Sequence, residues 1–256
     1  MQLENIILTK QENVAIITIN HPPVNAWNWA TVQDFEKALG AVEDDSEVRV
    51  VIITGAGDKC FSAGFDVKDA GNAHQISPKA RELWRRIDRF PKPVIAAING
   101  YALGGGLELA MCCQFRMMED VPETRLGLTE LHLGIIPGWG GTQRLPLLVG
   151  KAKALDMILF SRKIGAAEAL GAGLVNQLSA PGRLMDDALA FAEKLARRPP
   201  LAVGWVLRSM AAGTYEGLDA GLKVEEEGSK IVGQSDDRKE GFSAFLEKRQ
   251  PKFTGK

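Results

Sequence analysis

The chain has 256 residues, of which 45% are hydrophobic and 25% charged, as in an ordinary soluble globular protein. Its formal net charge of -1 gives no bulk electrostatic reason to expect binding to nucleic acid or to an anionic membrane. No apolar run approaches the roughly 20 residues that span a bilayer, and the N-terminus lacks the apolar segment of a secretory signal. The three cysteines show no disulfide pattern, so a reducing cytoplasm is the expected location.

Strand and helix patterns alternate through the first 198 residues. Runs of β-branched or wholly apolar side chains predict strands over 14–19, 48–54, 94–98, 115–118 and 174–176. Amphipathic spacing predicts a helix over 31–42, and Ser77-Pro78 marks the start of another that ends near Phe90. The run over 48–54 (VRVVIIT) is typical of a strand buried on both faces. The alternation predicts an α/β core with crossover connections.

The pattern changes after Pro199-Pro200, beyond which no convincing strand is found. Three helices are predicted, over 201–212, 215–232 and 237–248. So small a unit could hardly bury a core of its own, and we expect it to pack on the main domain or on a neighbouring subunit. The predicted domains are therefore an α/β core over 1–198 and an α-helical region over 199–256.

The cysteines give no sign of a disulfide framework or a zinc site. Cys60, Cys112 and Cys113 include an adjacent pair and no CxxC spacing, and the histidines lie far apart without a ligand pattern. Cys112 and Cys113 fall in an apolar helical stretch, where we interpret them as small core residues. No metal site is expected.

Two familiar glycine motifs are only partly present. The turn after the strand over 48–54 contains Gly55 and Gly57, but the third glycine of a dinucleotide-binding fingerprint is replaced by Cys60. The segment 100–104 (GYALG) has the spacing of a hydrolase nucleophile elbow, but its central residue is Ala102, which carries no nucleophile. Both functions are excluded on these grounds.

Two other glycine-rich segments directly follow apolar strands: CFSAGFDVK over 60–68 and NGYALGGGLEL over 99–109. Three consecutive glycines allow unusual backbone angles and the close approach of a ligand. The first N–H groups of a helix have no intrahelical partner, so one N–H from each loop could hold an oxyanion. Tight packing alone would also explain a glycine triplet.

These segments, together with LTELHLGIIPGWGGTQRL over 128–145, resemble the enoyl-CoA hydratases of the crotonase superfamily. The resemblance runs almost end to end and includes GAAEALGAGLVNQL over 165–178 and DDRKEGFSAFLEKRQPKF over 236–253. It implies a crotonase-like spiral of ββα units. It also implies that the C-terminal helical region forms a homotrimer, two of which commonly stack as a homohexamer.

Carried over by position, the resemblance places the oxyanion hole at the N–H groups of Phe65 and Gly105, and the catalytic carboxylates at Glu108 and Glu130. The N–H of Gly138 would help to position the attacking water. The residues themselves support the pair, because Glu108 lies three positions beyond Gly105 on the same helix face, and Glu130 precedes a Gly/Pro-rich loop. Taken alone, either glutamate could equally be an exposed charged residue of a helix or loop.

The implied reaction is the reversible addition of water across the 2,3 double bond of an enoyl-CoA thioester. One glutamate would be protonated and the other ionised, in an order that the sequence leaves open. Coenzyme A is part of the substrate, and no further cofactor is implied. The residues expected to bind this acyl-CoA thioester are Ala63, Asp66, Val67, Lys68, Trp139 and Lys248.

Departures from the family pattern leave the acyl group open. Trp139 stands where small residues are common, which would suit a hydratase of a cyclic or conjugated dienoyl-CoA. A Δ3,Δ2-enoyl-CoA isomerase is disfavoured by the intact glutamate pair. A further alternative is an acyl-CoA-binding or RNA-binding scaffold, suggested by the basic residues over 79–89, although a solvated helical face explains them more simply. Gln114 and Ser229 replace an acidic and an aromatic residue of relatives.

Overall fold

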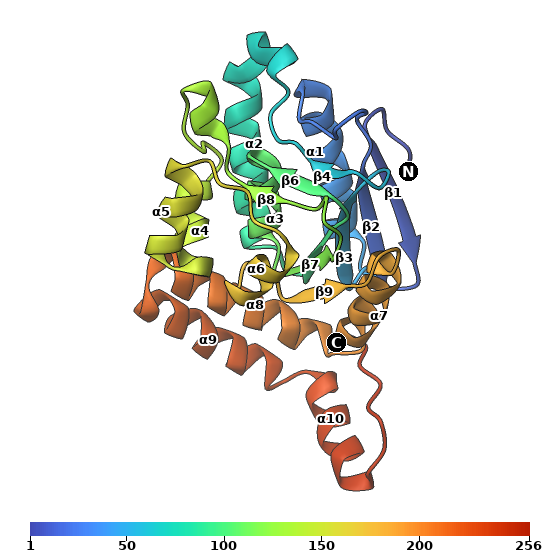
Figure 1. The fold of residues 1–256 in the computed structure, drawn as a ribbon. Coiled ribbons are helices and arrows are strands. Elements are labelled where there is room, and N and C mark those ends of the chain that lie inside the picture. Colours follow the sequence, from blue (N-terminus) through green and yellow to red (C-terminus); the bar gives the residue numbers. More distant parts are fainter.

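Continuous apolar runs form the centre of a six-stranded sheet in the computed structural model, which describes all 256 residues (Figure 1). The strands, in spatial order, are β1 (Ile6–Gln11), β2 (Val14–Ile19), β3 (Val50–Gly55), β5 (Val94–Ile98), β7 (Phe115–Glu119) and β9 (Gln177–Ser179). β1 pairs antiparallel with β2, and every other neighbouring pair is parallel. All six residues of β3 are buried, as its sequence predicts.

A second, three-stranded parallel sheet consists of β4 (Cys60–Ser62), β6 (Tyr101–Leu103) and β8 (Leu126–Gly127). Along the chain, β4 directly follows β3, β6 follows β5 and β8 follows β7, and each of the three is followed by a helix. The turn from β5 to β6 requires glycine, because a Cβ atom at Gly100 would lie 2.2 Å from the backbone of Lys59. The repeated strand–strand–helix unit confirms the predicted crotonase-like spiral.

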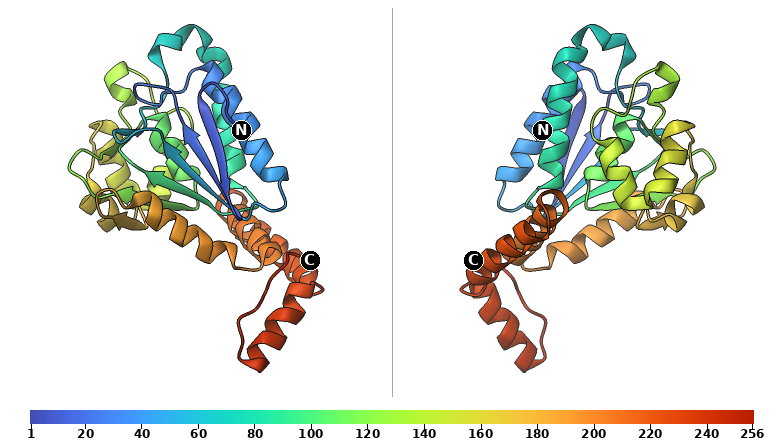
Figure 2. Two further views of the ribbon diagram at one scale, coloured as in Figure 1. Left: turned by 90° about the vertical axis from the view of Figure 1, so that its right-hand side faces the viewer. Right: turned by 90° about the vertical axis from the view of Figure 1, so that its left-hand side faces the viewer.

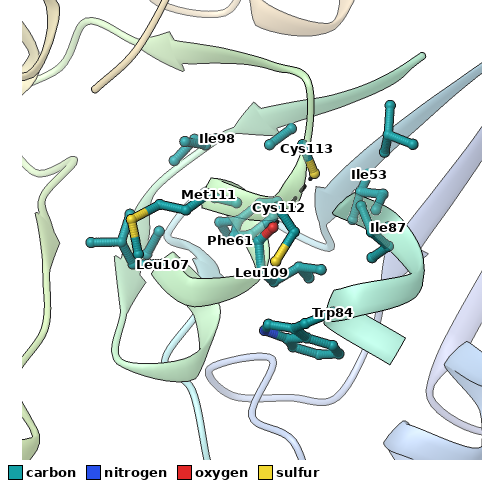
Figure 3. Packing of buried hydrophobic residues seen from close by; sticks show 14 of the residues in the cluster. Ile53, Phe61, Trp84, Ile87, Ile98, Leu107, Leu109, Met111, Cys112 and Cys113 are labelled. Carbon is teal, nitrogen blue, oxygen red and sulfur yellow. Dashed lines mark hydrogen bonds between the residues drawn. The ribbon is translucent and has the colours of Figure 1, made fainter. Parts of the chain in front are cut away.

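Helices cover both faces of the main sheet. α1 (Trp29–Asp44), α2 (Ala73–Asp88) and α3 (Gly105–Cys112) bury the larger core against one face. α7 (Leu184–Ala196) packs on the other, against the alternate side chains of the same strands (Figure 2). Cys112 and Cys113 lie among apolar side chains around α3, which confirms their expected role as core residues (Figure 3).

The C-terminal helices extend away from this core. α8 (Pro200–Glu216) and α9 (Leu218–Val232) pack against each other beneath it, and α10 (Asp236–Glu247) projects further outward (Figures 1 and 2). The three helices confirm the sequence pattern, while the division into domains near residue 199 stays a prediction. None of the helices combines the length and apolar character needed to cross a membrane.

Several elements differ from the sequence expectations. The second helix begins at Ala73, not at Ser77, and contains Pro78 in its second turn, because a 3-10 helix, η1 (Val67–Asn72), leads directly into it. The last strand lies at 177–179, not at 174–176, since Leu174 and Val175 pack into the core before pairing with β7 begins. The remaining elements are η2 (Glu130–Leu133), α4 (Gly141–Val149), α5 (Lys151–Leu159) and α6 (Ala166–Gly171).

Candidate active site

The two glycine-rich loops meet backbone to backbone. A Cβ atom at Gly64 would lie 2.7 Å from the backbone nitrogen of Gly105, and Gly64 also has a positive φ of 86°, so only glycine fits there. Trp27 donates its N–H to Gly64 and accepts the N–H of Asp66, which leaves the Phe65 N–H directed away from Trp27. The fold therefore brings together the two residues predicted to form the oxyanion hole.

Glu108 lies in the first turn of α3 and is only 1% exposed. Its Oε1 atom accepts hydrogen bonds from the N–H groups of Trp139, at 2.8 Å, and Gly141, at 2.7 Å. Burial, with a smaller contribution from the charge of Glu130, outweighs the two N–H groups and the cation of Arg144 and raises the pKa of Glu108 to about 7. Glu108 can therefore exist in either protonation state near neutral pH.

Glu130 approaches the same glycine loop from η2. A Cβ atom at Gly104 would lie 2.9 Å from its Oε1 atom, and Gly104 has a positive φ of 50°. Burial raises the pKa of Glu130, and its Oε2 atom is buried without a hydrogen-bond partner in the protein. Because a buried polar atom without a partner is costly, this oxygen is positioned to bind a ligand or a water molecule.

The loop over 137–141 forms another wall of the site. Gly138, the predicted water-positioning residue, lies beside the two N–H groups that hold Glu108. The Trp139 side chain is 5% exposed and packs edge-on against Phe65, with ring centroids 6.3 Å apart. A Cβ atom at Gly105 would lie 2.3 Å from Cζ3 of Trp139, so this ring rests directly on the glycine loop.

A buried ion pair that the sequence analysis missed supports this loop. Arg144 donates from Nη1 to the carbonyl oxygen of Trp139, at 2.9 Å, and from Nε and Nη2 to the Asp88 carboxylate. Tyr215 of α8 donates its hydroxyl to Asp88 at 2.9 Å. One signal of this network was available, because Asp88 falls four residues after Trp84 on the apolar stripe of α2, where a charge needs a buried partner.

The other predicted substrate-binding residues divide into two groups. Ala63, Asp66, Val67 and Lys68 surround the Phe65 loop, where the Asp66 side chain caps η1 by accepting the N–H of Lys68. Lys248 follows α10, which projects away from the core, so the fold does not bring it to the site of its own chain (Figure 1).

Comparison with known proteins places these features in a family. The model of the family described as enoyl-CoA hydratase/isomerase matches residues 9–256. A short-chain-enoyl-CoA hydratase of Clostridium acetobutylicum is 40% identical over 98% of this chain and 97% of its own length. A crotonyl-CoA hydratase of Syntrophomonas wolfei is 40% identical over the full length of both chains. The crystal structure of an enoyl-CoA hydratase from Bacillus anthracis superposes with a TM-score of 0.94 at 37% identity, covering 99% of this chain and 100% of that one.

Proposed function

The chain belongs to the enoyl-CoA hydratase/isomerase family and is an enoyl-CoA hydratase, in which we propose that Glu108 and Glu130 are the acid–base pair. One observation carries the assignment: the buried Glu108 carboxyl group contacts the loop over 137–141, and the Glu130 carboxyl group, from another element, lies against Gly104 at the start of the helix that carries Glu108. Glu108 is fixed there by two N–H groups, whereas Glu130 offers a buried oxygen without a protein partner. Two such groups can hold one water molecule and exchange its protons.

The proposed reaction starts when the thioester carbonyl oxygen accepts hydrogen bonds from the N–H groups of Phe65 and Gly105. This polarisation withdraws electrons from the β-carbon. The water oxygen bonds to that carbon, one water proton passes to the ionised glutamate, and the protonated glutamate delivers a proton to the α-carbon. Dehydration is the same path reversed. These groups account for every proton transfer, so we propose that no metal or redox cofactor takes part.

The alternatives receive less support from the structure. Moving a double bond requires a proton shuttle but no attacking water, so a second carboxyl group at the site favours hydration over isomerisation. The basic face of α2 is partly neutralised by ion pairs of Lys79 with Glu36, Arg86 with Glu43 and Arg89 with Glu216. This pairing favours a solvated helical surface over an RNA-binding face.

Assembly and location form part of the same proposal. α8 to α10 expose large apolar side chains that a neighbouring subunit would cover: Val206, Met210, Leu218, Leu222, Phe242, Phe245 and Leu246. Their exposure supports a homotrimer or a stacked homohexamer, in which Lys248 would reach the coenzyme A of an adjacent subunit. The three unpaired, buried cysteines fit a reducing compartment, and we propose the cytoplasm.

The test is the loss of enoyl-thioester absorbance with crotonyl-CoA. Glu108→Gln and Glu130→Gln should each lower kcat by about 10²–10⁴ in folded protein, because each removes a proton-transferring group. Glu123→Gln, which changes an exposed glutamate, is the matched control. Near-normal turnover by either active-site variant would contradict the assignment.

A further inference from the structure

We propose that the Trp139 side chain closes the acyl end of the site and restricts the enzyme to short, straight-chain enoyl groups such as crotonyl. The inference rests on the proposed function, since it uses the oxyanion hole at Phe65 and Gly105 to place the thioester. Under this proposal, one side chain determines the length of the acyl group that the enzyme accepts.

The position of the ring relative to both oxyanion residues carries the argument. Atoms Cζ3 and Cε3 of Trp139 would lie 2.3 and 2.4 Å from a Cβ atom at Gly105, and the same ring packs edge-on against Phe65. A carbonyl oxygen held by the N–H groups of these two residues places the following acyl carbons beside the ring. The indole therefore occupies space that a longer chain would need.

The ring is held firmly and would not swing aside at small cost. It also packs against Trp84 in a T-shaped arrangement, with 5.5 Å between ring centroids, and the Trp84 Nε1–H donates to the carbonyl oxygen of Gly105 at 3.3 Å. Trp84 in turn packs against Trp27 and Phe35, both fully buried in the main core. The backbone of Trp139 is fixed at both ends, by Glu108 at its N–H and by Arg144 at its carbonyl.

Open space lies on the outer side of this wall. A surface groove of about 750 Å³ runs between α2 and the loop over 136–144, and Trp139 contributes to its lining. Arg81 and Arg85 border the same groove and are exposed. Truncating the indole should therefore connect the acyl site with a groove large enough to take a longer chain.

The experiment compares kcat/KM for crotonyl-CoA, 2-decenoyl-CoA and cyclohexa-1,5-diene-1-carbonyl-CoA in the wild type, Trp139→Ala and Trp139→Phe. The wild type should prefer crotonyl-CoA to decenoyl-CoA by about tenfold or more, the discrimination that a closed apolar pocket provides. In Trp139→Ala this ratio should fall at least about tenfold, with the decenoyl value rising in absolute terms. Trp139→Phe retains a ring and should keep the preference.

Both variants keep the Trp139 backbone N–H that holds Glu108, so a changed ratio reports the side chain. Because Trp139→Ala leaves a cavity, its folding is checked by circular dichroism. If Trp139→Ala does not fold, Trp139→Phe supplies the comparison. A tenfold change of the kcat/KM ratio in Trp139→Phe would overturn the inference. Equal use of both straight chains by the wild type, or preferred use of the cyclic diene, would overturn it while leaving the hydratase intact. Absence of turnover with every thioester would overturn the proposed function as well.

Discussion

Replacing Glu108 by glutamine should make the protein more stable at alkaline pH while nearly abolishing its activity. Burial raises the pKa of Glu108 to about 7 from an ordinary value of 4.5, so ionising this side chain opposes folding. One pKa unit corresponds to about 1.4 kcal/mol, and the difference of about 2.5 units therefore costs the folded wild type about 3 kcal/mol above pH 7. Glutamine remains neutral and can still accept both N–H groups.

The pH window follows from the direction of the shift. Stability linked to a raised carboxyl pKa is fully present below about pH 4.5 and is lost as the pH rises through about 7. Glu108→Gln should thus exceed the wild type by about 3 kcal/mol at pH 8.5, but by less than about 1 kcal/mol at pH 5. For a chain of this length, the alkaline difference corresponds to a rise in Tm of roughly 6–12 °C.

Thermal unfolding at both pH values, at one protein concentration, measures the effect. Concentration must be fixed because an oligomer gains apparent stability by mass action. Glu123→Gln, at an exposed position, should follow the wild type at both pH values. An equal Tm difference at pH 5 and pH 8.5, or none at either, would refute the conclusion that Glu108 is buried with a raised pKa.

Two further changes test the surroundings of the pair. Asp88→Asn should lower the free energy of unfolding by about 3 kcal/mol, measured by urea denaturation, because it leaves the buried Arg144 cation without its carboxylate; a loss below 1 kcal/mol would show that the pair is solvated. Gly105→Ala should lower both Tm and activity, because its Cβ atom would overlap the Trp139 ring. Adding Trp139→Ala to the same chain should restore part of the lost Tm. Strictly additive losses of Tm in the double variant would contradict the contact.

The sequence predicted the central strands, the helices α1 and α2 and the three C-terminal helices, but not α4 to α7, although α7 has 13 residues. The parallel strands at 50–55 and 94–98 were found because burial on both faces leaves a continuous apolar run. The strands β4, β6 and β8 span only two or three residues and form because they pair with one another. Strands this short show no alternation of apolar and polar residues from which they could be predicted. β1 was also missed, since only its first residue is buried and no apolar alternation stands out.

The candidate site shows the same division between local pattern and tertiary packing. Glu108 and Glu130 could be proposed because glycine-rich segments flank them in a recognisable order, and the fold places the Glu130 carboxyl group against Gly104, at the start of the helix that carries Glu108. The support from Asp88, Arg144 and Tyr215 was missed because it joins α2, α4 and α8, which only the folded chain places together. The catalytic and substrate-binding roles themselves stay predictions.

The loop over 137–141 joins catalysis to substrate choice through a single residue. The N–H of Trp139 holds Glu108, its carbonyl oxygen is held by Arg144, and its side chain closes the acyl site under our proposal. Because the first two contacts come from the backbone, the side chain can change without removing the hydrogen bonds that orient the carboxyl group. A residue placed in this way allows the acyl specificity to vary while the acid–base pair keeps its geometry. A side chain at Gly141 would instead disturb the pair directly, since a Cβ atom there would lie 3.0 Å from Oε1 of Glu108.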